Sequence, residues 1–239
     1  RKTTSHRRKP LTQATIQHYL VLIRQIYNRL TKLGHYDGKN PATQLEYRQL
    51  NNEITEILTS EQAHNLVRVL STSENRNLAN LVLLAYYTGM RRGELFNLQW
   101  KDVSLPEKKL LIQTPKSGKQ VEICYFEDKA RNALQEQLDL ANSGSLPESP
   151  FVFPGWHGNK LTDIKRFWNR IRQAAGLPSD FRFHGLRHNY ASQLAISGQV
   201  TPIQIKEALR HSSLKVTQRY IDLTEDSMRS VAEVFEKRS

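Results

Sequence analysis

Residues 75–100 read NRNLANLVLLAYYTGMRRGELFNLQW, and this stretch decides the fold class. Its first part, Asn75 to Tyr87, is mostly apolar, which predicts a largely buried helix. Gly89 ends that helix, because glycine adopts the left-handed backbone conformation of a helix end without steric cost. A helix this apolar must be covered by other elements, so we expect it to lie inside a folded domain.

The spacing of apolar residues changes from helical to alternating after Trp100. Residues 110–114 and 119–126 alternate on either side of Lys116-Ser117-Gly118, which predicts a β-hairpin. Capping residues mark helix starts at Thr59-Ser60-Glu61-Gln62 and at Thr201-Pro202. Further helices are expected over 128–141, 162–175, 184–197 and 225–237. The sequence therefore predicts a mainly α fold with a small antiparallel β-sheet, of the α+β class.

The domain organisation follows from a second helical region near the N-terminus. Apolar residues recur at three- and four-residue steps from Ile16 to Leu33, which predicts one helix. We assign 1–42 to a partial helical segment, 43–57 to a linker and 58–239 to the main domain. Residues 1–9 carry five positive charges and no negative one, so they form either a basic arm along phosphates or a terminus that improves solubility. Since no Met begins the chain, we expect a piece of a longer protein.

The charge of the chain gives the first indication of a partner. Lys and Arg number 35 against 23 Asp and Glu, a net charge of +12. Nucleic acid is favoured over a membrane because no strongly amphipathic basic helix occurs, although a merely basic globular protein would have the same charge. The longest nearly apolar run, Leu78 to Tyr87, has half the length that crosses a bilayer. The single cysteine, Cys124, excludes an internal disulfide and suits a reducing compartment, so we expect the cytoplasm.

Six residues are candidates for chemistry, although each alone has an ordinary structural explanation. They are Arg91, Lys116, His184, Arg187, His211 and Tyr220. A basic residue after a helix end can simply face solvent, and a lysine is normal in a polar turn. His184 and Arg187 share one helical face by their spacing, which is common by chance. The order and context of the six residues decide between these interpretations.

Four motifs stand in a fixed order along the chain. They are Thr88 to Leu95 (TGMRRGEL), Thr114 to Lys119 (TPKSGK), His184 to His188 (HGLRH), and Ala208 to Leu214 (ALRHSSL) followed by Val216 to Ile221 (VTQRYI). Together they resemble the motifs of tyrosine recombinases, the phage integrase family. The resemblance covers nearly all of 59–221, and 14–42 is similar to the last part of the family's helical core-binding domain. One position departs from the pattern. Arg210 stands where the family usually has glycine, so either the helix end tolerates a side chain or the helix continues.

The resemblance implies strand exchange on DNA. Tyr220 would attack a DNA phosphate and form a covalent 3′-phosphotyrosyl link, which frees a 5′ hydroxyl and keeps the bond energy for rejoining. Arg91 and Arg187 would bind the non-bridging oxygens, because guanidinium groups match phosphate geometry and stay charged. Their charge takes the place of a metal ion, so we expect neither a metal nor a nucleotide cofactor.

The remaining candidates receive supporting roles from the same resemblance. His184 would act as a general base or hydrogen-bond donor, and His211 would donate a hydrogen bond to the phosphate. Lys116 would protonate the leaving 5′ oxygen. Glu94 would orient Arg91 or form a plain surface ion pair. His188 is expected to pack or to contact phosphate rather than to act as a second base.

The resemblance also implies partners: double-stranded DNA at specific recombination sites, and a homotetramer on paired sites formed from a chain that is monomeric in solution. The 43–57 linker would be the hinge of a C-shaped grip on DNA. The 225–237 helix would contact a neighbouring protomer or pack on its own core. Basic side chains that could contact the DNA backbone are Arg92, Lys119, Arg166, Arg170, Arg172 and Arg182.

Three other functions fit parts of the sequence. A type IB topoisomerase uses the same residue types on one DNA molecule, without pairing sites. A DNA-binding regulator of the same fold would have lost catalysis, yet all six candidate residues are present. An unrelated RNA-binding protein would be expected to carry aromatic RNA-binding motifs, which the sequence lacks. We therefore predict a site-specific DNA recombinase, a tyrosine-type DNA strand transferase.

Overall fold

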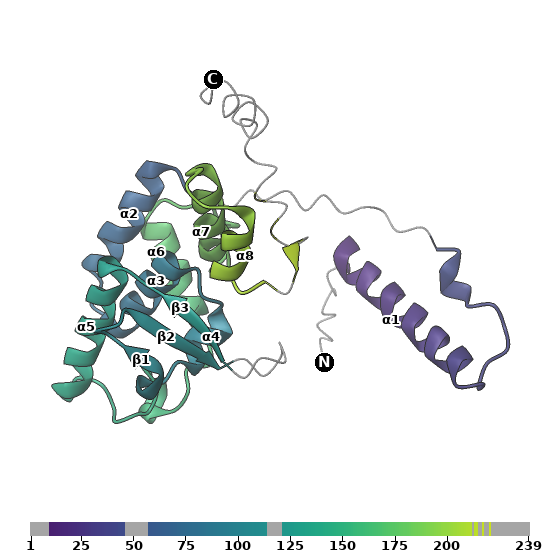
Figure 1. Ribbon diagram of the computed structural model, residues 1–239, viewed down its shortest axis with the longest axis horizontal. Helices are drawn as coiled ribbons and strands as arrows, with labels where there is room; N and C mark the ends of the chain where they lie inside the picture. The colour runs from purple at the N-terminus through teal and green to yellow at the C-terminus, as the bar shows by residue number, and fades with distance from the viewer. Residues whose placement is uncertain are drawn as a thin grey trace, which may run out of the picture. The chain divides into compact units, whose positions relative to one another are not determined.

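The computed structural model describes residues 10–45, 57–113 and 121–211, and the single positions 213, 214, 217 and 220. The packing of the chain divides it into two compact units, Arg1–Glu53 and Ile54–Ser239, which we call the N-terminal and C-terminal units. The division falls inside the 43–57 segment that the sequence assigns to a linker. Figure 1 shows the described elements of both units as ribbons.

The described part of the N-terminal unit consists of helix α1 (Gln13–Lys32) and the short 3₁₀ helix η1 (Pro41–Thr43). Thr12 caps α1 with its side-chain oxygen, in line with the preference of threonine for helix starts. The returning chain is tied to the helix by Arg24, whose Nη2 donates to the Ala42 carbonyl at 2.9 Å. No α1 residue is buried, and its apolar stripe is exposed at Ile16, Tyr19, Ile23 and Ile26.

Helices are the main regular structure in the described part of the C-terminal unit, which confirms the predicted mainly α fold class. In chain order they are α2 (Ser60–Ser71), α3 (Arg76–Thr88), α4 (Arg92–Asn97), α5 (Asp128–Asn142), α6 (Lys165–Ala174), α7 (Gly185–Ile196) and α8 (Pro202–Ala208), with 3₁₀ turns η2 (Trp100–Asp102) and η3 (Trp156–Gly158). Thr59 forms the expected capping box, and Thr201 is the expected capping residue before Pro202 and forms a capping box as well. The predicted 225–237 helix lies outside the described residues.

Two details of the helices differ from the sequence expectation. Helix α6 begins at Lys165 rather than near residue 162, because the Asp163 side chain accepts a hydrogen bond from the Lys165 backbone nitrogen at 3.0 Å and forms a turn instead. Helix α4 was not predicted, since its six residues are too short for a helical period to be recognised.

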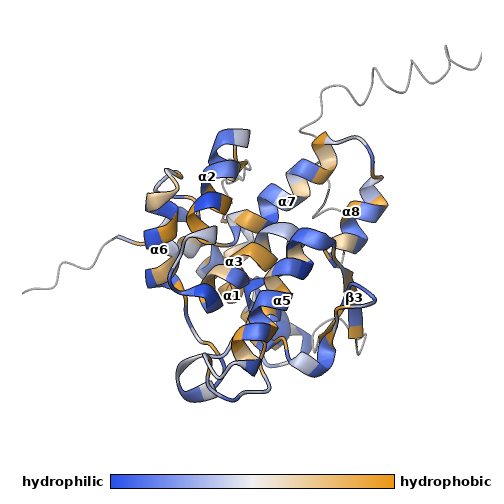
Figure 2. Cartoon of the chain, turned by 90° about the vertical axis from the view of Figure 1, so that its left-hand side faces the viewer, coloured by the Kyte–Doolittle hydropathy of each residue, from blue (hydrophilic) through white to orange (hydrophobic). Residues whose placement is uncertain are grey.

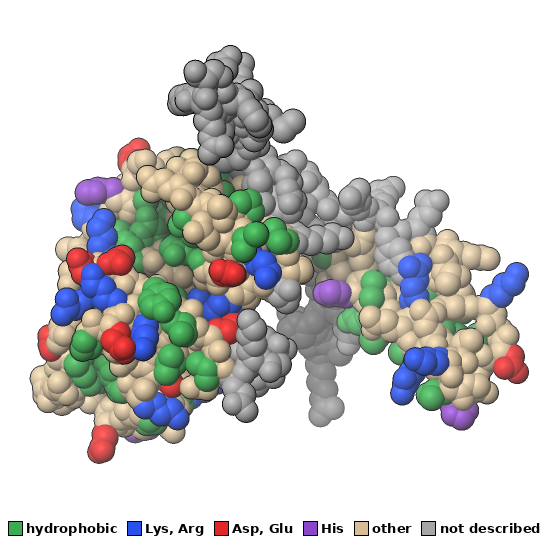
Figure 3. All heavy atoms as spheres, viewed as in Figure 1, with side chains coloured by type: hydrophobic (Ala, Val, Ile, Leu, Met, Phe, Trp, Pro, Cys, Tyr) green, Lys and Arg blue, Asp and Glu red, His purple; other side chains and the backbone are tan. Residues whose placement is uncertain are grey.

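A three-stranded antiparallel sheet follows α4, in the order β1 (Val103–Ser104), β2 (Lys109–Gln113) and β3 (Val121–Tyr125). The predicted hairpin is confirmed as β2 and β3, and its turn, 114–120, lies outside the described residues. One face of the sheet is buried through Leu110, Ile112 and Cys124. The other face carries exposed apolar side chains on β3, and Figure 3 shows hydrophobic side chains gathered over the sheet among charged ones. The two-residue strand β1 gives no alternating pattern, so the sequence did not predict it.

The core of the C-terminal unit is built around α3, as its apolar sequence predicts. Helices α2, α5 and α7 pack against it, and Figure 2 shows its hydrophobic residues in the interior of the unit. Leu81 and Leu84 are fully buried, and burial of each such side chain contributes about 1.5–3 kcal/mol. A second, smaller apolar cluster lies between α7 and α8, and it contains Tyr220. Among the described residues, no helix combines the length and the apolar composition needed to cross a membrane.

Candidate active site

The junction between α3 and α4 fixes the backbone of Arg91. Helix α3 ends at Gly89, whose φ of 61° is a left-handed conformation that glycine adopts without strain. A Cβ at Gly89 would lie 2.5 Å from Cδ1 of Tyr190 on α7, so a side chain there would force Tyr190 to move. Arg91 is the capping residue directly before α4, and its backbone nitrogen donates to Oε2 of Glu94 at 2.8 Å. A glycine turn on one side and a buried carboxylate on the other hold this backbone in place.

Both terminal nitrogens of the Arg91 guanidinium donate hydrogen bonds within the chain. Nη1 donates to Oε1 of Glu94 at 2.7 Å, and Nη2 donates to the Arg210 carbonyl at 2.7 Å. The side chain of Glu94 is 7% exposed, whereas that of Arg91 is 38% exposed. Arg91 therefore reaches the surface, while the carboxylate that it pairs with is enclosed. Burial raises the pKa of the Glu94 carboxyl, but attraction by Arg210 and hydrogen bonds from Arg91 bring that pKa below its usual value. Glu94 is therefore ionised, which suits an orienting contact.

Arg187 approaches the same region from α7 and is buried, with 3% of the residue exposed. Its Nη1 donates to the Gly89 carbonyl at 2.7 Å, and its Nη2 donates to the Leu209 carbonyl. Burial, and then the positive charge of Arg91, lower the pKa of the Arg187 guanidinium to about 9. The group is charged at neutral pH, and an anion bound beside it would stabilise that charge.

Arg91 and Arg187 both donate hydrogen bonds to backbone carbonyls at the C-terminal end of α8. Backbone carbonyls at a helix C-terminus have no partner within the helix and carry partial negative charge, which favours cations. Here the Leu209 carbonyl accepts from Arg187 and the Arg210 carbonyl accepts from Arg91. Two guanidinium groups are thereby brought to neighbouring carbonyls, an arrangement suited to the two non-bridging oxygens of one phosphate.

Tyr220 lies in the apolar cluster between α7 and α8 and is 1% exposed. Its hydroxyl oxygen lies 2.6 Å from Nδ1 of His188, which follows Arg187 on α7. The ring of His211 is nearly parallel to that of Tyr220, with centroids 6.4 Å apart. His211 Nδ1 in turn lies 3.0 Å from Oγ1 of Thr217. The tyrosine hydroxyl is thus held by a histidine in a covered position.

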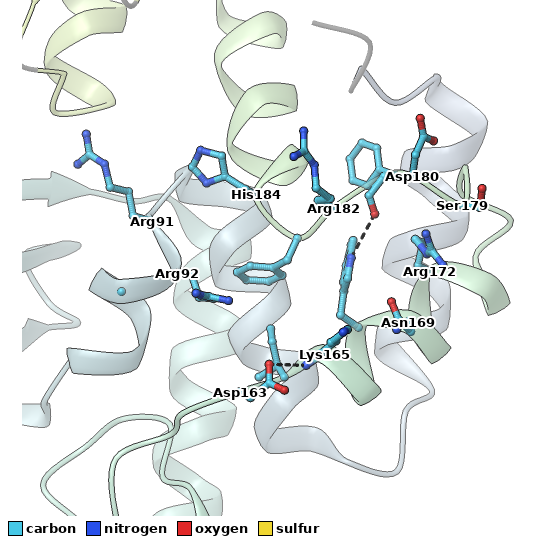
Figure 4. Close-up of a pocket in the computed structure, with 15 residues that line it drawn as sticks. Arg91, Arg92, Asp163, Lys165, Asn169, Arg172, Ser179, Asp180, Arg182 and His184 are labelled. Carbon is cyan, nitrogen blue, oxygen red and sulfur yellow. Dashed lines mark hydrogen bonds between the residues drawn. The ribbon is translucent and has the colours of Figure 1, made fainter. Parts of the chain in front are cut away.

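His184 directly precedes α7 and lines a cavity of about 1040 Å³ together with Arg91 (Figure 4). Its ring meets that of His188 edge to face, with centroids 4.8 Å apart. Basic side chains supply much of the cavity wall: Arg91, Arg92, Lys165, Arg172 and Arg182. A hollow lined in this way attracts a polyanion. No group of three or more His, Cys, Asp or Glu side chains in the described part of the chain could hold a metal ion.

Comparison with known proteins places the chain. The Phage integrase family matches it over residues 56–227. The chain belongs to the phage integrase family. Relatives of this integrase-family chain include the tyrosine recombinase XerC of Xylella fastidiosa (strain M23), 30% identical over 92% of this chain and 74% of the relative. A tyrosine recombinase of Thermosipho africanus (strain TCF52B) is 24% identical over 89% of this chain and 73% of the relative. The predicted family and enzyme class are therefore confirmed.

Solved structures share the integrase fold at low sequence identity. A Tn1549 transposon integrase in complex with a circular intermediate DNA matches with a TM-score of 0.80 and 18% identity, over 95% of this chain and 81% of that one. XerH recombinase bound to its difH substrate matches with a TM-score of 0.73 and 21% identity, over 95% of this chain and 67% of that one. These likenesses confirm the predicted fold, a mainly helical unit with a small antiparallel sheet.

Of the six candidate catalytic residues, the described part of the chain contains all but Lys116, and Lys119, a candidate DNA contact, shares its segment. Lys116 lies within 114–120, outside the described residues. The other five lie at the adjoining ends of α3, α7 and α8: Arg91, His184, Arg187, His211 and Tyr220. Glu94 contacts Arg91 through two hydrogen bonds. For His188 the sequence suggested packing or phosphate contact, and the structure adds a direct contact with the Tyr220 hydroxyl.

Sequence reasoning missed the contribution of Arg210. In the sequence, Arg210 is a departure from the usual glycine, and either a helix end that tolerates a side chain or a longer helix would explain it. Helix α8 in fact ends, and Arg210 adopts a left-handed φ of 54° with its side chain buried against Glu94. The signal that could have found it was the pairing of an unusual basic residue at a helix end with an acidic residue beside Arg91.

Proposed function

We propose that this chain cuts and rejoins DNA at specific recombination sites through a covalent 3′-phosphotyrosyl intermediate, with Tyr220 as the nucleophile. The observation that carries the proposal is the convergence of Arg91, Arg187 and Tyr220 on the end of α8. Both guanidinium groups bind its carbonyls, and Tyr220 packs in the cluster that includes Leu209. Attack on a phosphodiester needs this combination, because negative charge builds on the non-bridging oxygens while the nucleophile approaches.

The proposed step balances without an external reactant. The Tyr220 oxygen forms a bond to phosphorus, and the bond from phosphorus to the 5′ oxygen breaks. The tyrosine proton passes to His188 rather than to His184, which the sequence favours as the base. His188 lies 2.6 Å from the hydroxyl in the covered position and takes the proton as the tyrosine ring leaves it, while the leaving 5′ oxygen takes a proton from Lys116. Rejoining is the reverse reaction, in which a 5′ hydroxyl attacks the phosphotyrosine. The number of phosphodiester bonds is conserved, so no nucleotide hydrolysis is needed.

The remaining residues would stabilise the phosphate during this step. Arg91 and Arg187 each present N–H groups for a non-bridging oxygen, and His184 and His211 add hydrogen bonds. Loss of one such preorganised donor costs roughly 3–4 kcal/mol of transition-state stabilisation in comparable sites. In the described arrangement Tyr220 is almost fully covered, so its ring has to leave the cluster between α7 and α8 before its oxygen reaches a phosphate.

The proposed partner is double-stranded DNA, with a homotetramer on paired sites and a monomer in solution. The cavity beside Arg91 and His184 supplies a basic surface for the strand that flanks the reacting phosphate. A similar structure, a λ integrase dimer bound to a core site, matches with a TM-score of 0.67 and supports DNA as the partner. A cytoplasmic location goes with a DNA substrate and with a single, buried Cys124.

A covalent-trapping experiment tests the proposal. The chain and its Tyr220→Phe variant are incubated with nicked DNA that carries a candidate site, and the products are separated on a denaturing gel. We expect a protease-sensitive protein–DNA adduct with the wild type and none with Tyr220→Phe. Tyr220→Phe should still bind the same DNA, since it lacks the hydroxyl alone. An adduct in both proteins would show that another residue is the nucleophile.

Recombination is distinguished from its rivals by the arrangement of sites. On a supercoiled plasmid with two sites, the proposed enzyme joins DNA between sites, whereas relaxation of a plasmid without sites would indicate topoisomerase activity. DNA binding with neither reaction would indicate a regulator. Family membership and the named relatives, which are tyrosine recombinases, favour the first outcome.

A further inference from the structure

Arg210 occupies a backbone position that favours glycine. At the end of α8 the Arg210 nitrogen donates to the Glu207 carbonyl at 2.9 Å, and the His211 nitrogen donates to the Lys206 carbonyl at 3.0 Å. This pair of bonds is the Schellman motif, in which the left-handed residue is usually glycine. Arg210 fills that place with a φ of 54°. A residue with a Cβ is strained there, so the arginine lowers stability unless its side chain makes compensating contacts.

The Arg210 side chain is buried against the residue that holds Arg91. It is 3% exposed, and its Nη2 lies 2.8 Å from Oε2 of Glu94. The same oxygen accepts from the Arg91 backbone nitrogen, while Oε1 accepts from Arg91 Nη1. Nη1 of Arg210 donates to the Ala208 carbonyl at 2.9 Å. One enclosed carboxylate is therefore shared by two guanidinium groups, of which Arg91 is the one that reaches the surface.

This sharing sets the charge that Arg91 offers to a ligand. A carboxylate and a single guanidinium form a neutral pair, whereas a second guanidinium leaves one net positive charge. Because Arg210 is enclosed and Arg91 is exposed, that charge lies toward the cavity. Burial raises the pKa of the Glu94 carboxyl, and attraction by Arg210 is the largest of the effects that bring it below its usual value. The negative charge of Glu94 is thus neutralised by the enclosed guanidinium of Arg210.

We propose that Arg210 is a positioning residue that neutralises Glu94 and so leaves the charge of Arg91 available to the DNA phosphate. It acts on Arg91 through Glu94 and through its own carbonyl, which accepts from Arg91 Nη2. Its enclosed guanidinium does not itself meet DNA. The inference rests on the proposed function, because it takes the ligand of Arg91 to be the reacting phosphate.

Arg210→Gly is the informative variant, because glycine suits the left-handed turn and removes only the side chain. We expect the first-order rate constant for adduct formation on nicked DNA, at saturating protein, to fall about tenfold or more. The DNA Kd should change by less than about threefold, since many phosphate contacts together set affinity. Arg210→Gln removes the charge while keeping most of the packing, and it should show the same split if the glycine variant folds poorly. An unchanged rate constant overturns the proposal.

A second substitution separates charge balance from packing. In the Arg210→Gly background, Glu94→Gln removes the uncompensated carboxylate and frees the charge of Arg91 again. The double variant should therefore react about threefold or more faster than Arg210→Gly alone, a coupling of the size seen between contacting residues. If Arg210 only packed, removing Glu94 as well would disturb another buried group and slow the reaction further. A double variant that is as slow as Arg210→Gly, or slower, contradicts the proposed charge balance.

Lys108→Gly provides a matched control. Lys108 also has a left-handed φ, of 48°, and it also pairs with carboxylates, those of Glu127 and Asp128 at 2.8 Å. It lies in the turn between β1 and β2, and the carboxylates that it pairs with do not belong to the site. The adduct rate constant of Lys108→Gly should equal that of the wild type. A loss equal to that of Arg210→Gly would show that the effect comes from general destabilisation.

A measurement without DNA keeps this inference separate from the proposed function. The Glu94 carboxyl can be titrated by NMR in the wild type and in Arg210→Gln. We expect its pKa to rise in the variant, because the largest stabilising attraction on the carboxylate is gone. An unchanged Glu94 pKa overturns the role of Arg210 whatever the DNA assay gives. A wild-type chain that forms no adduct, with a Glu94 pKa that rises as expected, would overturn the proposed function alone.

Discussion

The hydroxyl oxygen of Tyr220 lies 2.6 Å from Nδ1 of His188, and the tyrosine is almost fully buried at that position. A phenol hydrogen-bonded to an imidazole has a group at hand to accept its proton. The same contact fills the cluster between α7 and α8, so it also holds the tyrosine ring in place. In the proposed mechanism, His188 is therefore placed both to receive the proton of Tyr220 and to restrain its ring.

Substitution of His188 by phenylalanine tests this double placement. Phenylalanine preserves the ring packing but cannot accept a proton, so adduct formation should slow roughly 100-fold or more. The measurement is the single-turnover rate on nicked DNA, with His157→Phe as a control because His157 is exposed in η3. A rate for His188→Phe equal to that of the wild type would assign the proton to another acceptor.

The Arg187 guanidinium should give the reaction an alkaline limit. Burial, and then the charge of Arg91, lower its pKa to about 9, whereas an unfolded arginine stays protonated beyond pH 12. We expect kcat/KM to fall as the pH rises through about 9, because the free enzyme then loses a phosphate-binding charge. At saturating DNA the inflection should move to higher pH, since the phosphate stabilises the charged form. A value of kcat/KM that stays level to pH 10 would contradict this assignment.

The same pKa shift predicts the opposite trend for stability. Between about pH 9 and pH 12 the folded chain releases a proton that the unfolded chain keeps. The contribution of Arg187 to the free energy of unfolding therefore rises with pH across that window. Urea denaturation of the wild type and of Arg187→Met at pH 8 and pH 10 checks the sign. The wild type should gain stability relative to the variant at the higher pH.

The cavity arginines should contribute to DNA affinity through counterion release. Replacing Arg182, which lines the cavity, by glutamine should weaken binding and make the slope of log K against log salt shallower by about 0.9. Arg131→Gln on α5 is a suitable control, because Arg131 is exposed and lies outside the cavity lining. Equal slopes for Arg182→Gln and the wild type would place the DNA backbone elsewhere.

Replacing Gly89 by alanine should destabilise the chain more than replacing Gly144. Both Gly89 and Gly144 have a left-handed φ, so alanine at either position pays a backbone cost of about 1–2 kcal/mol. A Cβ at Gly89 would also meet Tyr190 at 2.5 Å, whereas one at Gly144 meets nothing within 4 Å. Gly89→Ala should therefore be less stable than Gly144→Ala by about 1 kcal/mol or more in urea unfolding. Equal losses would mean that Tyr190 moves aside freely.

Local chemistry made much of the fold predictable. Thr59 and Thr201 begin helices because their side chains satisfy backbone nitrogens a few residues away. Gly89 ends α3 because glycine adopts the left-handed backbone conformation of a helix end without steric cost. The hairpin of β2 and β3 follows from alternation within a short stretch. By contrast, α4 and β1 are too short to carry a period, and tertiary contacts stabilise them.

The sequence by itself determined which residues this chain can use for chemistry, because the order and spacing of the motifs around Arg91, His184, Arg187 and Tyr220 are properties of the chain. The tertiary structure alone decided how those residues are held. Arg91 and Arg187 join the start of α4 and helix α7 to the end of α8 through the Arg210 and Leu209 carbonyls, and His188 joins α7 to Tyr220. Sequence periodicity reports which face of an element is buried, and it carries no information on which buried partners meet. The shared carboxylate of Glu94 depends on packing over 116 positions of sequence separation, so it could be seen only in the folded chain.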